Sequence, residues 1–180
     1  MFENIIKNVH NRHPLIHCIT NYVSINDCAN IVLACGGAPI MAEDINEVSQ
    51  ITSICQGLDI NIGMLNDNKL SSMLKAGATA NELGIPVILD PVGAGSSDYR
   101  IKAVQNLMSN VHFGVIRGNV SEIKAIAAKQ GIHNIAAGVY DTMQKNKSAM
   151  GVEAGIADKI TDDNIKEMAD FINKLSQKTG

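Results

Sequence analysis

The sequence predicts an α/β fold in which a mostly parallel sheet carries helices on both faces. Five short apolar runs recur along the 180-residue chain and alternate with segments of helix length. The runs are apolar on nearly every residue rather than on every second one, which is typical of parallel strands that are buried on both sides. A chain of this length suffices for one ordinary domain with a sizeable core, so we expect residues 1–180 to form a single domain.

The apolar runs are the expected strands, and they span residues 15–20, 38–41, 58–63, 86–90 and 113–118. The helices between them are expected to begin at residues that cap helix N-termini: Ser24, Asn66 or Asp67, Ser96 or Ser97, and Asn119. Helix ends are expected at Gly36, Gly84 and Gly131. Beyond them we expect a loop or insertion around the polar residues 144–148, and then one more helix after Thr161.

Composition and charge exclude several classes of function. Fifteen Lys and Arg against eighteen Asp and Glu give a net charge of −3, and the chain has only three Tyr and three Phe, so we expect no nucleic-acid partner. The longest stretch without a charged or strongly polar side chain, residues 31–42, is shorter than the roughly 18 residues of a membrane span. Because the N-terminus also has no apolar run of signal-peptide length, we expect a cytoplasmic protein without membrane association.

Several residues with reactive side chains are expected to be structural. The four cysteines, Cys18, Cys28, Cys35 and Cys55, have spacings that match neither a zinc site nor a redox pair, and buried reduced thiols are the expected state. His17 lies inside an apolar strand, which favours a core histidine over a catalytic base. Met64 and Met73 are expected to fill gaps in the core.

Residues that could bind a ligand lie at the ends of all five expected strands, and most of them are polar residues or glycines. Ligands of open parallel sheets bind beyond the carboxyl ends of the strands, so these residues are the candidates for a functional site. They are Thr20 and Asn21; Met41, Ala42 and Glu43; residues 61–63; residues 90–95; and Arg117, Gly118 and Asn119 with Glu122.

Asp90, Arg117 and Glu122 are the candidates for nucleotide and magnesium binding. Asp90 leads into a glycine-rich turn whose backbone N–H groups could approach a phosphate, and carboxylates are magnesium ligands. Arg117 could neutralise a phosphate. Two structural alternatives stay open, because Asp90 before a proline is also a common turn start and Glu122 three residues after Asn119 has the spacing of a capping box.

Taken together, four segments resemble the hydroxyethylthiazole kinase family, which belongs to the ribokinase-like group. They are HCITNYVSINDCANIVLACGGAPIMAEDINEV, LDINIG, GIPVILDPVGAGSSDYR and FGVIRGNVSEIKAIA, and they follow the family pattern in order and spacing over residues 15–128. Weaker similarity resumes at residues 151–154 and continues through the expected last helix. Met64 departs from the threonine that is usual after NIG.

The resemblance implies a function and assigns roles to the candidate residues. It implies phosphorylation of the hydroxyl of 4-methyl-5-(2-hydroxyethyl)thiazole in thiamine biosynthesis or salvage, with ATP as co-substrate and Mg²⁺ as cofactor. Met41 would contact the thiazole, with Asn21 and Gly63 nearby. Arg117 would bind ATP, and Asp90 and Glu122 would form the acidic magnesium site. Family members are homotrimers with active sites between subunits, so a homotrimer is expected for a completed chain.

The resemblance also implies that the chain is truncated at its C-terminus. Relatives continue with a further strand and helices and with a GTGC segment, which supplies an anion hole and the catalytic cysteine. No catalytic residue is therefore assigned here, and the 180-residue chain alone is expected to be inactive. Two alternatives stay open: a non-catalytic thiazole-binding or oligomer-forming module, and another small-alcohol kinase of the same fold that differs around Met41, Gly63 and Met64.

Overall fold

The computed structural model describes residues 2–129, which fall into two compact units. The first unit contains the chain up to Asp90 together with Ser109–Arg117, and the second contains Pro91–Met108 and the described residues from Gly118 on. The expected single domain stays a prediction. Gly131, the polar stretch 144–148 and the helix expected after Thr161 lie outside the described residues.

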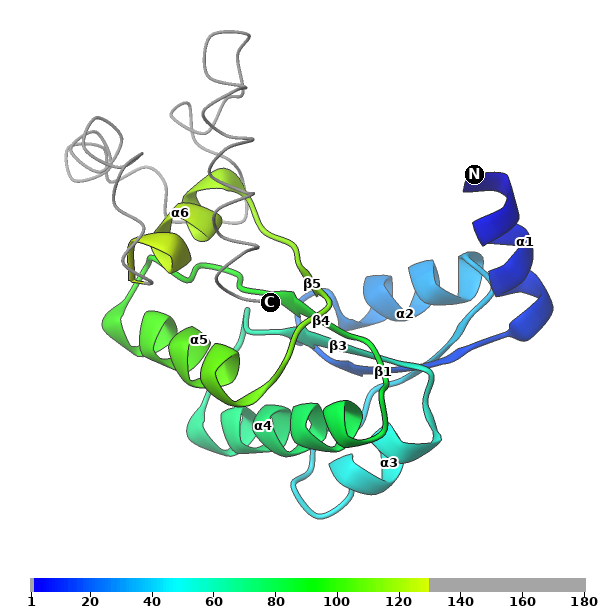
Figure 1. Ribbon diagram of the computed structural model, residues 1–180, viewed down its shortest axis with the longest axis horizontal. Helices are drawn as coiled ribbons and strands as arrows, with labels where there is room; N and C mark the ends of the chain where they lie inside the picture. Colours follow the sequence, from blue (N-terminus) through cyan, green and yellow to red (C-terminus); the bar gives the residue numbers. More distant parts are fainter. Residues whose placement is uncertain (1, 130–180) are drawn as a thin grey trace, which may run out of the picture. The chain divides into compact units, whose positions relative to one another are not determined.

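A five-stranded sheet forms the centre of the first unit (Figure 1). Its strands are all parallel, in the order β2-β1-β3-β4-β5. They span Leu15–Ile19 (β1), Ala38–Ile40 (β2), Gly57–Asn61 (β3), Val87–Asp90 (β4) and Val115–Ile116 (β5). Each predicted apolar run overlaps one of these strands, so the predicted α/β fold with a parallel sheet is confirmed.

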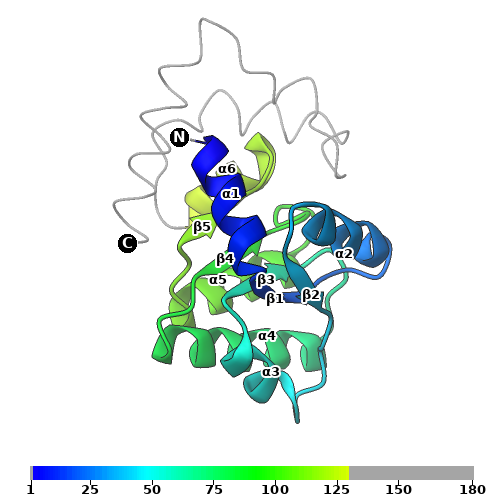
Figure 2. The same ribbon diagram turned by 90° about the vertical axis from the view of Figure 1, so that its right-hand side faces the viewer.

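One face of the sheet is fully buried. It carries Ile19, Leu58, Ile60, Val87 and Leu89, which are completely enclosed. Helices α3 (Val48–Ile54) and α4 (Asp67–Glu82) lie on this side in both ribbon views (Figures 1 and 2). The core of the first unit therefore lies between this sheet face and these two helices.

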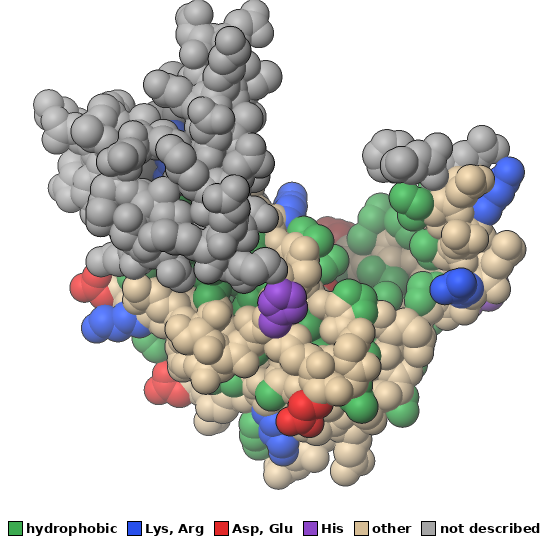
Figure 3. Space-filling model, in the orientation of Figure 1, with side chains coloured by type: hydrophobic (Ala, Val, Ile, Leu, Met, Phe, Trp, Pro, Cys, Tyr) green, Lys and Arg blue, Asp and Glu red, His purple; other side chains and the backbone are tan. Residues whose placement is uncertain are grey.

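The opposite face of the sheet is only partly covered. Its central row consists of Cys18, Asp59, Ile88 and Val115, and the last two side chains are 41% and 52% exposed. Helices α1 (Phe2–Arg12) and α2 (Ile25–Ala34) lie on this side (Figure 2). Figure 3 shows hydrophobic side chains at the surface along α1, where Ile5 and Ile6 are exposed.

Three residues that the sequence placed in the core, Cys28, Cys35 and Met64, are not buried. Helix α2 buries none of its residues, so Cys35 at its end is exposed and Cys28 is only half-buried. Met64 lies in the loop after β3 and is also exposed. By contrast, Cys18, Cys55 and Met73 are buried as predicted. Cys28 lies in a helix and Cys35 follows it, as predicted, but this helix lies on the partly exposed face of the sheet and buries none of its residues.

Local signals predicted most helix ends correctly. Asn66 caps α4 by accepting a hydrogen bond from the Lys69 N–H at 2.9 Å, and Gly36 and Gly84 follow α2 and α4 with φ of +93° and +68°. Ser24 precedes α2, but its side chain makes no capping bond. Helices α1 and α3 were not predicted, and α3 has no side-chain capping bond at its start.

The second unit contains most of α5 (Asp98–Asn110) and α6 (Val120–Lys129). Ser97 caps α5 by accepting from the Arg100 N–H at 3.2 Å, which decides between the two predicted serines. The glycine-rich turn of residues 91–95 approaches α6 closely, because a Cβ at Gly95 would lie 3.1 Å from Cβ of Ala125. This close packing brings the turn to the first residues of α6.

Candidate functional site

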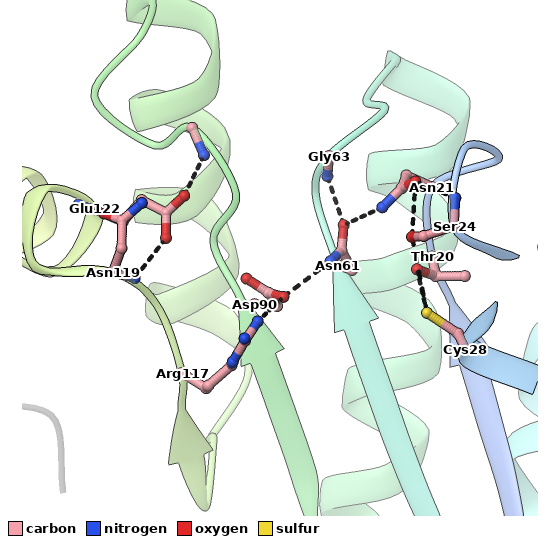
Figure 4. Close-up of polar contacts among 11 residues, drawn as sticks. Thr20, Asn21, Ser24, Cys28, Asn61, Gly63, Asp90, Arg117, Asn119 and Glu122 are labelled. Atoms are coloured by element: carbon pink, nitrogen blue, oxygen red, sulfur yellow. Dashed lines mark hydrogen bonds and ion pairs between the residues drawn. The ribbon is translucent and has the colours of Figure 1, made fainter. Parts of the chain in front are cut away.

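A chain of side-chain hydrogen bonds crosses the carboxyl ends of the strands in the first unit (Figure 4). Asn21, after β1, donates to Oδ1 of Asn61 at 3.3 Å. Asn61, the last residue of β3, donates to Oδ2 of Asp90 at 3.0 Å, and Arg117 donates to the same oxygen at 2.9 Å. Three predicted site residues, Asn21, Asp90 and Arg117, are thus joined through Asn61, a strand-end candidate for which no specific role was predicted.

Gly63 completes this network at the end of β3. Its N–H donates to Oδ1 of Asn61 at 2.8 Å. A Cβ at this position would lie 2.9 Å from Oδ1 of Asn61 and 3.0 Å from Nδ2 of Asn21, so a larger residue would push the amide pair apart. The predicted site residue Gly63 therefore lies against Asn21, and the absence of its side chain makes the contact possible.

Asp90 combines burial with ionic pairing. Burial raises the pKa of its carboxyl group above the ordinary value, and the charge and hydrogen bond of Arg117 and the hydrogen bond of Asn61 act in the opposite direction. The Arg117 side chain is 77% exposed, so its guanidinium holds Asp90 while most of its surface faces solvent. This geometry suits a group that binds a charged ligand from solution.

Asp59 is a second carboxyl group on the same face, one pleat below Asp90. Burial raises its pKa to about 6, with a further rise from the charge of Asp90 and an opposing effect of Arg117. Asp59 was not among the predicted site residues, although an acid in the middle of the apolar run LDINIG is a visible signal. Asp59, Asp90 and Arg117 form one electrostatically coupled group.

Met41 follows β2 and is half-buried, and a buried histidine fixes the segment behind it. Nε2 of His17 donates to the carbonyl oxygen of Ala42 at 2.8 Å, and Nδ1 lies 2.9 Å from Oγ1 of Thr52. Burial lowers the pKa of His17, against the backbone hydrogen bond of Ala42 and the charge of Glu47, so the ring is neutral. The predicted core role of His17 is confirmed.

Glu122 lies in the second unit and has the capping role that the sequence left open. Asn119 accepts from the Glu122 N–H at 2.9 Å, and Oε2 of Glu122 accepts from the Asn119 N–H at 2.8 Å. Its other oxygen, Oε1, accepts from the Gly93 N–H at 2.9 Å (Figure 4). Glu122 is buried, and it therefore ties the glycine-rich turn to the start of α6.

The magnesium role of Asp90 and Glu122 stays a prediction, and the chemistry of Asp90 is compatible with it. In residues 2–129 no group of three or more His, Cys, Asp and Glu could hold a metal ion. Magnesium needs no such group, because it keeps several waters and is bound through one or two carboxylates and the phosphates of the nucleotide. Asn61 and Arg117 both use Oδ2 of Asp90, and neither contact uses Oδ1.

Comparison with known proteins gives the same result as the sequence motifs. The family model described as the hydroxyethylthiazole kinase family matches residues 6–165. The chain belongs to the hydroxyethylthiazole kinase family. The resemblance of the four segments is thereby confirmed, and the residues at the strand ends are those of a member of this family.

Relatives of this hydroxyethylthiazole kinase family member are longer than the chain. It is 51% identical over its whole length to hydroxyethylthiazole kinase of Clostridium acetobutylicum and 44% identical over 97% of its length to that of Methanobrevibacter smithii, and it spans 60% and 57% of those proteins. The structure of the Pyrococcus horikoshii OT3 protein, which is 39% identical, matches 74% of the chain with a TM-score of 0.69. The chain spans 52% of that protein.

Within the described part of the chain, no helix is both long enough and apolar enough to cross a bilayer.

Proposed function

We propose that this protein transfers the γ-phosphoryl group of ATP to the hydroxyl of hydroxyethylthiazole, with Mg²⁺ as cofactor. Membership of the hydroxyethylthiazole kinase family supports the reaction class. The observation that carries the proposal is the hydrogen-bonded chain from Asn21 through Asn61 and Asp90 to Arg117. It connects the residues proposed for the thiazole with those proposed for the nucleotide.

On this proposal the thiazole binds at the ends of β1, β2 and β3. Met41 contacts the ring through its polarizable thioether, and Asn21 and Gly63 lie beside it. Asn61 holds Asn21 in place, because its Oδ1 accepts from both the Asn21 amide and the Gly63 N–H. Phosphoryl transfer depends mainly on positioning, so a rigid amide pair next to the acceptor alcohol is a useful device.

The nucleotide is assigned to the charged residues. Arg117 neutralises phosphate charge, and its exposed guanidinium is suited to that task. Asp90 and Glu122 are assigned to magnesium, which would neutralise the negative charge of the phosphates during transfer. Asn61 and Arg117 hold Asp90 in one orientation, so its carboxylate is ready for a cation.

A homotrimer is part of the proposal. The exposed side chains of Ile5 and Ile6 on α1 and of Ile31 and Leu33 on α2 give the first unit apolar surface for contacts between subunits. Sedimentation analysis of the completed protein is expected to give three times the mass of one completed subunit. A stable monomer would contradict the proposed homotrimer.

The experiment uses residues 1–180 continued by the C-terminal part of the Clostridium acetobutylicum relative. We expect this fusion to form thiazole phosphate from ATP, and Asp90→Asn to reduce kcat/KM about 100-fold or more. The matched control is Asp98→Asn, which changes an exposed aspartate in the first turn of α5 and is expected to stay within about twofold of the unchanged fusion.

The outcomes separate the proposal from its alternatives. If the fusion binds hydroxyethylthiazole but transfers no phosphate, the non-catalytic binding module is supported instead. If it phosphorylates other small alcohols in preference, the substrate assignment is wrong while the reaction class stands. If Asp90→Asn has no larger effect than Asp98→Asn, the magnesium role of Asp90 is wrong.

A further inference from the structure

Lys69 is a buried lysine in the first turn of α4, close to the proposed thiazole-binding residues. Only 3% of its side chain is exposed. Lysine is almost never buried to this extent unless its charge is paired. A positive charge in the first turn of a helix also lies at the positive end of the helix dipole, so its position there is unfavourable without a strong partner. The residue therefore needs an explanation in terms of its contacts.

Three contacts surround the Lys69 ammonium group. It donates a hydrogen bond to the carbonyl oxygen of Thr20, lies 2.8 Å from Oε2 of Glu43, and lies 4.4 Å from the centre of the Tyr22 ring. An ammonium group has three N–H donors and is also attracted to aromatic rings, so these contacts match its chemistry. Because the side chain is enclosed, Lys69 acts on a ligand through its neighbours rather than by touching it.

Glu43 is the acidic partner and is itself held on both sides. Burial would raise the pKa of Glu43, but the hydrogen bonds from Lys69 and Tyr22 and the charge of Lys69 outweigh it, and the pKa is lowered. The carboxyl group is therefore ionised at neutral pH. Its side chain is 40% exposed, so it remains hydrated on its outer side.

These contacts connect two segments that carry candidate site residues. Thr20 directly precedes Asn21, and Glu43 follows Met41 by two residues. We propose that Lys69 is a positioning residue that holds the Asn21 segment and the Met41 segment in register and thereby sets the affinity for the thiazole. The inference rests on the proposed function, because that proposal makes Asn21 and Met41 the thiazole-binding residues.

The test compares Lys69→Met with Lys75→Met in the 180-residue chain. Lys75 lies on the same helix and donates to the carbonyl oxygen of Ile45 at 2.9 Å, so it contacts the same segment after β2 but is exposed. The Asn66 cap uses the backbone N–H of residue 69 and survives both substitutions. Loss of Lys69 removes one donor from the Thr20 carbonyl and leaves Glu43 partly hydrated rather than buried and unpaired, so both variants are expected to fold.

Two measurements read out the effect. Hydrogen exchange is expected to become about tenfold faster in residues 20–24 and 41–47 of Lys69→Met, and to change less than twofold in Lys75→Met. Calorimetric titration with hydroxyethylthiazole is expected to give an approximately tenfold weaker Kd for Lys69→Met alone. Glu43→Gln is expected to weaken binding similarly, and the double variant Lys69→Met/Glu43→Gln to be no weaker than either single one, because both act through one contact.

Each outcome bears on one of the two proposals. If Lys69→Met binds hydroxyethylthiazole as tightly as the unchanged chain, the positioning role is wrong and the proposed function stands. If the unchanged chain does not bind hydroxyethylthiazole, hydrogen exchange alone decides whether Lys69 holds the two segments, and the fusion described above decides the proposed function. Unchanged exchange in both segments overturns the inference.

Discussion

At the scale of single residues, Asp59 shows how one buried carboxyl group couples stability to pH. It lies in β3 between Leu58 and Ile60, and burial together with the charge of Asp90 raises its pKa to about 6, against an opposing effect of Arg117. An unfolded aspartate has a pKa near 3.9. The folded state therefore binds a proton more tightly, and this contribution to stability is present at low pH and lost as the pH rises through about 6.

Asp59→Asn is accordingly expected to stabilise the chain at neutral pH. The free energy of unfolding, measured with urea at pH 7.5, should rise by about 1–2 kcal/mol because the buried charge is removed. Near pH 4 the folded wild-type residue is already protonated, so the difference between the two proteins should largely disappear. Equal stability of both proteins at pH 7.5 would contradict the raised pKa.

The capping box at α6 gives a second prediction at this scale. Asn119→Ala removes the side chain that accepts from the Glu122 N–H, and it is expected to cost about 1 kcal/mol in free energy of unfolding. Asn119→Asp keeps an acceptor at this position and is expected to retain most of the stability. The measurement is urea unfolding at pH 7, and a loss of the same size in both variants would show that the cap is not responsible.

At the scale of elements, the packing of α4 against the loop before β5 depends on one glycine. A Cβ at Gly77 would lie 2.5 Å and 2.7 Å from the two methyl groups of Val111, which is buried. Gly77→Ala would gain about 1 kcal/mol of helix propensity, but the clash is expected to outweigh it and to give a net loss of about 1–2 kcal/mol. Thermal unfolding of Gly77→Ala and of Gly77→Ala/Val111→Ala tests this, since the double variant should recover stability lost to the clash.

Strand β5 has a partner on one side only among the described strands, and Val115 on it is exposed. Unpaired strand edges with apolar side chains tend to associate, so the 180-residue chain is expected to self-associate at micromolar concentration. Val115→Lys should reduce this association in light scattering. The matched control is Val23→Lys, the same change at a highly exposed loop position away from the edge, and an equal effect of both would exclude the edge as the cause.

The sequence predicted these elements to different extents. The five strands were recognisable because a buried parallel strand is apolar on nearly every residue, and α4 and α6 were recognisable from Asn66 and Asn119. Helix α3 was not predicted because it is seven residues long and its N-cap residue, Glu47, makes no side-chain capping bond. The exposure of Cys35 could not be predicted, because it depends on which sheet face is covered and not on the pattern within α2.

At the scale of the whole molecule, activity is expected to need more than the 180 residues. The chain spans 57–60% of two curated relatives. We expect the anion hole to lie in the part of those relatives that the chain does not span. Loss of even one preorganised donor typically costs about 10²–10³ in rate. The chain alone, incubated with ATP, Mg²⁺ and hydroxyethylthiazole, should form no detectable thiazole phosphate by radiolabel assay, and adding the C-terminal part of a relative should restore it.

The candidate site was partly visible in the sequence for a physical reason. Asn21, Gly63, Asp90 and Arg117 follow strands, and parallel strands bring their carboxyl ends to one edge. Lys69 was not visible, because its partner Thr20 lies 49 residues away and only the fold brings the two together. The bridging role of Asn61 was missed similarly, since its partners come from β1 and β4.

The hydrogen bond between Glu122 and Gly93 affects how an anion and a cation would bind together at the second unit. The Gly93 N–H already donates to a carboxylate oxygen, so an anion that binds through this N–H must exchange with Oε1 of Glu122 instead of entering a vacant site. The displaced oxygen then needs a new positive partner, and a divalent cation supplies one. Such an exchange favours binding of the anion and the cation together over binding of either alone. Each ion would then raise the affinity for the other by the same factor.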